Sequence, residues 1–532
     1  MSKRLFKKFQ IFFENYKNKK NDFTDQPGDI ILVDFNGWSG THIAQLLIAN
    51  IFSQIAKKKI IGFSHNFFFQ NNTLKLKIIF YLKWFLGSLF NLRNFGIYKN
   101  LGTKKIFFMN PTNYQIYRAK QFKNFFYKKK IKKEKILKLR ISNILIGDII
   151  YDSFMHQYKK ETIEVYDPLF IRYFEKFVAT YFFWVDYLKE NKVNTVISSH
   201  PTYLDGLPSR IGIHLNIRCF IVGYNRVYSL NKKIIYPQRE HISFKKTFSK
   251  LTPQSKKLAL IKAKSKIKKR FQGKLGDMIY LTKTAFGSIK KKKVLVPSNK
   301  KKILIAAHSL SDAPHARGQG IFVDFYEWLK FLFKLSKNTN YDWYIKCHPN
   351  FHEYDDKTIE IIKDLVKKNK NVKWVPPLTS HNQLIKEGIN LALTVDGSIG
   401  LEYPYFNIPV FNASRFNSHM NYKFNEHPQT IKEYKNLILN FKKHKSKIKK
   451  NEIFECYFMS NDFYNNNWLI NDYDKLTSYI DGNYRDINIS KKMYNYFEAS
   501  LNQNNFNYIV DNFINFYLKN EYIFNPIYND KY

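Results

Sequence analysis

The chain has 532 residues, too many for a single hydrophobic core, so its length predicts two or three domains. A formal net charge of +46 ordinarily indicates a membrane surface or nucleic acid as partner, but Lys, Asn, Ile, Phe and Tyr are abundant together, so part of the charge is compositional bias and we expect no nucleic-acid partner. The three cysteines lie far apart without a CxxC pair, which excludes a disulfide framework and a cysteine zinc site and favours a reducing compartment.

The N-terminal segment 1–20 mixes lysine with phenylalanine and lacks an uninterrupted apolar run, so we expect no secretion signal there. Residues 77–98 are rich in Phe, Leu and Ile but include charged residues, which predicts a buried or interfacial helix rather than a spanning one. Lysine runs at 128–133, 290–293 and 442–450 add charge that anionic lipid attracts. We therefore expect a cytoplasmic protein that associates peripherally with the inner membrane.

The first half of the chain shows strand and helix patterns in alternation. An apolar strand at 30–34 leads through a turn at 36–40 into a helical pattern at 41–56, and a second strand follows at 59–64. Residues 110–190 look mostly helical. Further on, strands at 193–199 and 217–223 flank a helix near 208–216. The order strand, helix, strand predicts a parallel sheet.

The alternation is cleaner in the second half. The patterns predict strands at 303–307, 343–347, 372–375, 391–395 and 409–411, with helices at 321–335, 357–368, 380–387 and 399–405. The fold class is therefore α/β, with two doubly wound parallel-sheet domains and added helices. Two such domains facing a cleft form the architecture known as GT-B.

We divide the chain into four parts. They are a first α/β domain with a helical insertion at 1–244, a basic linker with helices at 245–300, a second α/β domain at 301–450, and a helical tail at 451–532 that braces the first domain.

Two predicted strands of the second domain end in residues suited to phosphate. His348-Pro349 follows one strand, and proline turns the chain out so that the imidazole reaches the sheet edge. The other strand ends in Asp396, Gly397 and Ser398, followed by Gly400 and Glu402. Glycine permits close backbone approach, a helix start favours anions, and Glu402 could bind ribose hydroxyls. A structural helix cap at Asp396 or Ser398 is the alternative.

The loop 309–320 adds further candidates for the donor site. It places Ser309, Asp312, His315 and Arg317 close together, and an arginine there could clamp a phosphate in bidentate fashion. A solvated loop without a ligand is the alternative. Asp312 and His315 alone do not complete a metal site, so we expect neither a metal nor another cofactor.

Two loops of the first domain are candidates for the acceptor side. The segment 198–206 follows a strand and contains His200, Tyr203 and Asp205, with Arg210 in the next helix. His200 or Asp205 could take the proton of an acceptor hydroxyl, with Asp205 favoured, whereas a simple turn is the alternative. The turn at 36–40 lacks the GxGxxG spacing and is assigned to acceptor or cleft lining. Its candidates are Asn36, Gly37, Gly40 and His42.

The pair formed by His348-Pro349 and the Ser398 loop resembles the HP motif and the serine/glycine motif of bacterial glycosyltransferases that make capsule or surface polysaccharide. The Kdo transferases and the sialyltransferases that use CMP-activated sugars are among them. Segments 309–315 and 321–329 resemble the same group, and 198–210 does so loosely. The resemblance implies that His348 contacts the donor phosphate and that the loop of Ser398 lies against it.

These observations lead to one expected function and two alternatives. The first is a metal-independent GT-B glycosyltransferase that moves a sugar, such as Kdo, from a nucleotide donor, with a CMP-sugar favoured, to a capsule, lipopolysaccharide or other glycan or glycolipid acceptor. A CDP-polyol phosphotransferase of the teichoic-acid type is the second. A non-catalytic basic scaffold on membrane or nucleic acid is the third, although no nucleic-acid-reading module is visible.

Overall fold

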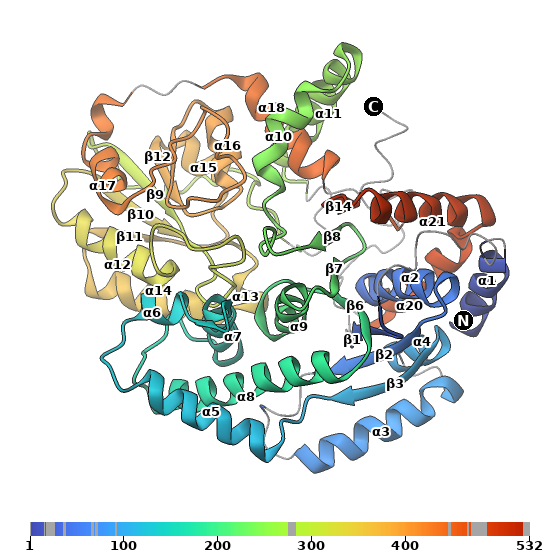
Figure 1. Ribbon diagram of the computed structural model, residues 1–532. Coiled ribbons are helices and arrows are strands. Elements are labelled where there is room, and N and C mark those ends of the chain that lie inside the picture. The colour runs from blue at the N-terminus through green and yellow to red at the C-terminus, as the bar shows by residue number, and fades with distance from the viewer. Residues whose placement is uncertain are drawn as a thin grey trace. The chain divides into compact units, whose positions relative to one another are not determined.

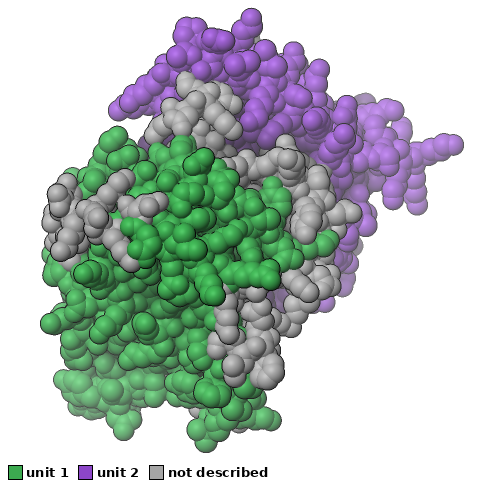
Figure 2. Space-filling model, turned by 90° about the vertical axis from the view of Figure 1, so that its right-hand side faces the viewer, with its two compact units in different colours: residues 1–150, 165–237, 465–531 green, residues 151–164, 238–464, 532 purple. Residues whose placement is uncertain are grey.

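A computed structural model describes residues 2–14, 16, 27–35, 39–64, 69, 73–90, 93–274, 283–444, 448–464, 468–469 and 487–524. The chain divides into two compact units (Figure 2). The first unit comprises residues 1–150, 165–237 and 465–531, and the second comprises residues 151–164, 238–464 and 532.

The units differ from the predicted parts in four places. Residues 151–164 and 238–244 belong to the second unit, although they lie inside the predicted first domain. The predicted linker 245–300 is part of the second unit, and the predicted tail is split near residue 464 between the two units.

The first unit is built on a seven-stranded sheet of order β14-β8-β7-β6-β1-β2-β3 (Figure 1). Its strands are β1 (Ile30–Asp34), β2 (Lys59–Ser64), β3 (Thr103–Phe108), β6 (Val193–Ser198), β7 (Arg218–Val222), β8 (Val227–Leu230) and β14 (Ile523–Phe524). The first five run parallel, β8 is antiparallel to β7, and β14 is antiparallel to β8. The parallel strands have the order of a Rossmann sheet, and this order reverses between β1 and β6.

Helices cover both faces of this sheet. They are α1 (Ser2–Glu14), α2 (Ser39–Ile55), α3 (Thr73–Phe90), α4 (Arg93–Asn100), α5 (Asn113–Phe126), α6 (Lys133–Leu137), α8 (Pro168–Glu190), α9 (Tyr203–His214), α20 (Ile487–Ser500) and α21 (Gln503–Leu518). A short hairpin, β4 (Arg140–Ile141) with β5 (Ile144–Leu145), leads into α7 (Gly147–Tyr158), within which the division between the units falls. Alternate strand residues face opposite sides, so Ile197 packs toward α2 and α21 whereas Val196 packs toward α9.

The N-terminal helix α1 is part of the core of the first unit. Leu5, Phe9 and Phe13 of α1 are buried, and the rings of Phe9 and Phe13 lie 5.8 and 4.8 Å from the ring of Phe506 in α21. The apolar side of α1 is therefore occupied by its own chain. No helix in the described ranges is long and apolar enough to cross a membrane.

The second unit has a five-stranded, wholly parallel sheet of order β11-β10-β9-β12-β13. Its strands are β9 (Lys302–Ala306), β10 (Asp342–Lys346), β11 (Val372–Val375), β12 (Ile389–Thr394) and β13 (Val410–Asn412). This is again the Rossmann order, with the reversal between β9 and β12. The predicted α/β class with two Rossmann-like sheets and added helices is confirmed.

The helices of the second unit complete two apolar layers. They are α10 (Phe244–Ser249), α11 (Pro253–Phe271), α12 (Phe325–Ser336), α13 (Phe351–Tyr354), α14 (Asp356–Lys368), α15 (His381–Lys386), α16 (Ile399–Tyr405), α17 (Ile431–Leu439) and α18 (Lys450–Phe458), with short turns η1 (Glu240–Ser243), η2 (Phe441–Lys443) and η3 (Met459–Phe463). Ile303 and Ile345 face the layer of α12, α14 and α17, whereas Leu304 and Tyr344 face that of α15 and α16.

Candidate functional site

A cavity of about 370 Å³ lies at the carboxyl ends of β9, β10 and β12, where the strand order of the second unit reverses. Ligands of open α/β sheets bind at this position. Seven of the predicted donor-site residues line the cavity, namely Ser309, Asp312, His348, Asp396, Gly397, Ser398 and Glu402. The other polar lining residues are Arg270, His308, Lys346, His381 and Thr394.

His348 follows β10 and faces the cavity, while Pro349 is buried behind it and is not part of the lining. The Nδ1 atom of His348 accepts the backbone N–H of Asn350 at 3.2 Å. In the neutral ring the proton therefore resides on Nε2, which is the atom able to donate to a ligand oxygen.

His308 follows β9 and has an equally defined tautomer. Its Nε2 accepts the backbone N–H groups of Val395 and Asp396, each at 3.2 Å. Burial and the charge of Arg317 lower the pKa of His308 to about 4, so the ring is neutral and carries its proton on Nδ1. His308 thus fixes the loop after β12 and presents one ring N–H.

Two cations of the cavity are absent from the predicted set. Lys346, the last residue of β10, is 3% exposed, and burial lowers its pKa to about 8 although Cys347 and Glu402 act in the opposite direction. Arg270 of α11 pairs with Glu402, with 2.7 Å between Nε and Oε1, and its Nη2 lies 3.4 Å from the Ser398 hydroxyl. The carboxylate predicted to bind ribose is therefore already paired with a cation.

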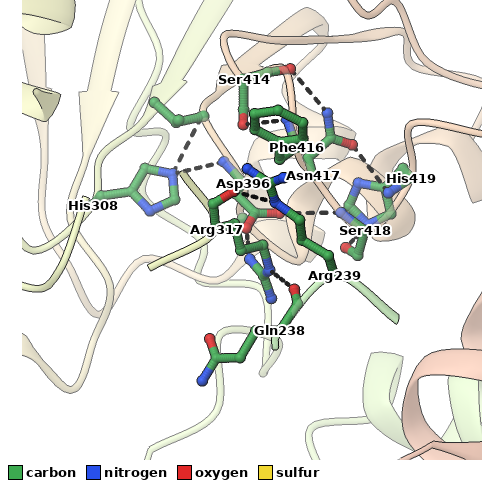
Figure 3. Close-up of polar contacts among 12 residues, drawn as sticks. Gln238, Arg239, His308, Arg317, Asp396, Ser414, Phe416, Asn417, Ser418 and His419 are labelled. Carbon is green, nitrogen blue, oxygen red and sulfur yellow. Dashed lines mark hydrogen bonds and ion pairs between the residues drawn. The ribbon is translucent and has the colours of Figure 1, made fainter. Parts of the chain in front are cut away.

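Arg317 lies beside the cavity without lining it. It forms an ion pair with Asp396, and its Nε donates to the carbonyl of Gln238 at 3.0 Å (Figure 3). Arg239 donates in turn to the carbonyl of Arg317 at 2.6 Å, and its guanidinium stacks on Phe416 at 3.7 Å. Arg317 therefore holds the Asp396 loop in place, a role different from the predicted phosphate clamp.

The loop after β12 offers fewer free N–H groups than predicted. Helix α16 begins at Ile399, and the N–H of Gly400 donates to the carbonyl of Gly397, whereas Leu401 and Glu402 donate to Ser398. The Ser398 side chain caps no helix N–H and is exposed to the cavity. The N–H of Gly397 donates to the Thr394 hydroxyl at 3.1 Å. What remains for a ligand is the Ser398 hydroxyl with the backbone N–H groups of Ser398 and Ile399.

The structure also gives His315 a role different from the predicted one. Its Nδ1 lies 2.5 Å from Asp152, its Nε2 lies 2.7 Å from the carbonyl of Val323, and the ring is buried away from the cavity. Both ring nitrogens thus serve the loop that follows β9. Ser309 likewise donates to Asp355 while touching the cavity wall.

Gly400 is a packing residue. A Cβ at this position would lie 2.6 Å from Nδ1 of the buried His419 and 3.1 Å from Asn412. We expect Gly400→Ala to lower the free energy of unfolding by about 1–3 kcal/mol, because an added methyl in a filled site forces neighbours apart. Thermal denaturation measures the loss.

The control for Gly400 is Gly287→Ala, because a Cβ on Gly287 would meet nothing within 4 Å. We expect its melting temperature to stay near that of the unaltered protein. An unchanged melting temperature for Gly400→Ala, together with weaker nucleotide binding, would instead restore the predicted contact with phosphate.

A second cluster lies at the order reversal of the first unit, between β1 and β6. Asp34, the last residue of β1, is buried and accepts from Gln45 and from both the N–H (2.8 Å) and the hydroxyl of Ser199. Burial raises the pKa of Asp34 to about 6. Burial and the charge of Asp34 raise the pKa of Asp205, in the first turn of α9, to about 7. Two carboxyls that titrate near neutral pH mark this cluster as a candidate acid/base site.

His200 and Tyr203 shape the wall of this cluster. The Nδ1 atom of His200 bonds to Thr202, and its ring stacks on that of Tyr203 at 5.5 Å. Tyr203 has a φ of 57°, a left-handed conformation that is costly for an aromatic residue and is found at functional sites.

The remaining acceptor-side candidates separate into three groups. His42 is fully buried and bonds to Tyr494, and Arg210 pairs with Asp148 at 3.1 Å, so both hold elements of the first unit together. Gly40 lies in the first turn of α2. Asn36 and Gly37 lie outside the described residues.

Four functional candidates were missed by the sequence reasoning for different reasons. Asp34 and Lys346 are the last residues of β1 and β10, and His308 directly follows the predicted strand 303–307, so their position alone could have identified them. Arg270 is 132 positions from its partner Glu402, and no local pattern connects the two residues. In the described part of the chain, no three His, Cys, Asp or Glu side chains gather so that they could hold a metal ion.

Comparison with known proteins leaves the family open. No family model and no curated protein matches the sequence. Among solved structures, the UDP-GlcNAc 2-epimerase of Neisseria meningitidis bound to UDP-GlcNAc is similar at 12% identity, covering 81% of this chain and 98% of its own, with a TM-score of 0.25. A glycosyltransferase of Rickettsia africae has 11% identity, coverage of 92% and 97%, and a TM-score of 0.22. Such low scores carry no weight here, and the fold assignment depends on the strand orders above.

Proposed function

We propose that the chain is a glycosyltransferase that binds a nucleotide-activated sugar in the cavity of the second unit. The observation that carries the proposal is the convergence of Arg270, Lys346 and His348 on a cavity at the order reversal of a Rossmann-like sheet. Side-chain cations and ring N–H groups stabilise the negative charge that develops on a departing phosphate.

The carboxyls of the first unit supply the other half of the proposed reaction. The sugar acceptor must lose a proton as its oxygen attacks the anomeric carbon, while the bond from that carbon to the phosphate oxygen breaks. A base with a pKa near the working pH is the most effective. Asp205, whose pKa is raised to about 7, is our candidate base, with Asp34 tuning it.

The finer parts of the proposal come from the resemblance of His348 and Ser398 to the capsule and Kdo glycosyltransferases. A CMP-activated acidic sugar is the proposed donor, and a glycan or glycolipid at the cytoplasmic face of the inner membrane is the proposed acceptor. Three free, buried cysteines accord with a reducing compartment.

The test is a thermal-shift series with CMP, CDP, UDP and GDP. A ligand that binds only the folded protein at 100 times its Kd adds about 2.7 kcal/mol of stability. We expect CMP to raise the melting temperature most. An unchanged melting temperature with all four nucleotides contradicts the proposal. If CMP is released from CDP-glycerol but not from CMP-sugars, the protein is a polyol phosphotransferase instead.

A further inference from the structure

Helix α3 of the first unit presents an apolar stripe to solvent. Large apolar side chains recur at one-turn spacing along its outer side, and these are Leu74, Ile78, Tyr81, Leu82 and Phe85. The opposite side of the helix is occupied, because Phe80 is buried among Phe35, Phe95 and Phe108. The helix is therefore fixed to the sheet while its apolar stripe stays uncovered.

Helix α5 adds exposed aromatic residues nearby. Tyr114, Tyr117 and Phe125 are exposed along one side of it. The ring of Tyr81 in α3 lies 5.5 Å from that of Phe108 at the end of β3, and α5 begins only five residues later. Figure 1 shows both helices along the lower border of the first unit. We name these eight exposed side chains the α3–α5 surface.

The charged residues of α3 and α5 themselves are all basic, and the neighbouring acids Asp186 and Glu175 of α8 are each paired with a cation of α5. No Asp or Glu occurs between Asp34 and Glu134, whereas lysines are frequent. At 100° per residue, Lys75 and Lys77 project on either side of the stripe of α3. Lysines in this arrangement extend their ammonium groups to lipid phosphates while their stems lie on the apolar boundary. Each adds attraction to an anionic bilayer.

We propose that the α3–α5 surface is the site at which the protein docks on anionic membrane, with α3 lying in the plane of the interface. An exposed apolar stripe flanked by lysines is the pattern of interfacial helices. A second copy is a poorer occupant, because a two-fold contact would set this acid-free surface against itself. The proposal deepens the membrane part of the proposed function and rests on it.

The experiment is sedimentation of the full chain with vesicles of phosphatidylcholine alone and of phosphatidylcholine with phosphatidylglycerol. The test variant is Leu82→Gln/Phe85→Gln, which replaces side chains that are 55% and 66% exposed. The matched control is Leu258→Gln/Ile261→Gln on α11, a lysine-rich helix where these side chains are 54% and 57% exposed.

We expect the unaltered protein and the control to bind the anionic vesicles, and the test variant to bind at least about tenfold more weakly. Lys75→Gln/Lys77→Gln should weaken binding to anionic vesicles and leave the small binding to neutral ones unchanged. Equal binding by the test variant and the control overturns the proposal. If the unaltered protein is a dimer, the test variant is a monomer and neither binds vesicles, the surface is the contact with a second copy.

The same protein variants distinguish a failure of this docking proposal from a failure of the proposed nucleotide-sugar site. The test variant should keep the nucleotide-induced rise in melting temperature, since α3 contributes nothing to the cavity. Vesicle binding without any nucleotide effect would leave the docking surface in place and reject the glycosyltransferase.

Discussion

Replacing Asp205 with Asn is expected to lower turnover by about 10²–10⁴-fold, the contribution of a general base, while nucleotide affinity stays unchanged. The amide is close in size to the carboxyl but cannot accept the acceptor proton. Because a base acts on the transition state, its loss reduces kcat rather than donor binding. Steady-state kinetics with a donor and a soluble acceptor, together with nucleotide titration, measure the two effects.

The pH profile provides a sharper readout for the same residue. With its pKa at about 7, Asp205 loses its proton between about pH 6 and 8, so kcat should rise over that interval in the unaltered enzyme. This rise should vanish in Asp205→Asn. His200→Asn is the matched comparison, because it changes the neighbouring ring and leaves the carboxyl in place. Near-normal turnover in both variants would make this loop structural, and Asp34 would become the candidate base.

The raised pKa of Asp205 should also make the free energy of unfolding depend on pH, which can be measured without any substrate. The folded state holds the Asp205 proton up to about pH 7, whereas the unfolded chain releases it near 4, so stability is lost as pH rises through this range. A shift of about three pH units corresponds to at most about 4 kcal/mol of unfolding free energy. Screening by solvent at this partly exposed side chain makes the contribution smaller. The difference in unfolding free energy between Asp205→Asn and the unaltered protein should therefore grow between about pH 4 and 7 and level off above pH 7.

The fold was predictable because its strands are buried on both faces and read as short apolar runs. The predicted strand 343–347 is β10, Asp342–Lys346, and the predicted strand 59–64 is β2. The predicted helix 321–335 starts late as α12 at Phe325. Asp324 caps this helix through the N–H of Glu327, and it also accepts from Tyr151 and Thr162, far away in the sequence. Tertiary contacts of this kind decide where an element begins.

Only those residues of the donor site that lie at or just after the end of a strand could be predicted from the sequence. His348 and Ser398 line the cavity, and both directly follow strands or strand turns. His42 and His315 look equally suitable in the sequence. Their partners Tyr494 and Asp152 lie 452 and 163 positions away, so burial and pairing of these two histidines have no local signal. Arg270 has no local signal either, because its partner Glu402 lies 132 positions away. Arg270 belongs to the basic segment that was predicted to be a linker, and it lines the cavity.

Lys346→Met should weaken nucleotide binding by about 10–100-fold, because a hydrogen bond from a cation to phosphate is worth about 1.5–3 kcal/mol. The methionine keeps the length of the buried stem and removes the charge. Lys373→Met on the neighbouring strand β11 is the matched control, since Lys373 pairs with Asp342 and does not line the cavity. Isothermal titration with the nucleotide that shifts the melting temperature most measures both variants.

Proton uptake distinguishes this role from simple packing. In the free protein burial holds the pKa of Lys346 at about 8, and a bound phosphate raises it, because an anion favours the charged ammonium. Binding above pH 8 should therefore take up a proton, and nucleotide affinity should fall as pH rises through 8 to 9. Titrations in buffers of different ionisation enthalpy reveal the uptake. Lys346→Met should abolish it and Lys373→Met should retain it, whereas affinity and proton uptake unchanged by Lys346→Met would remove this lysine from the phosphate site.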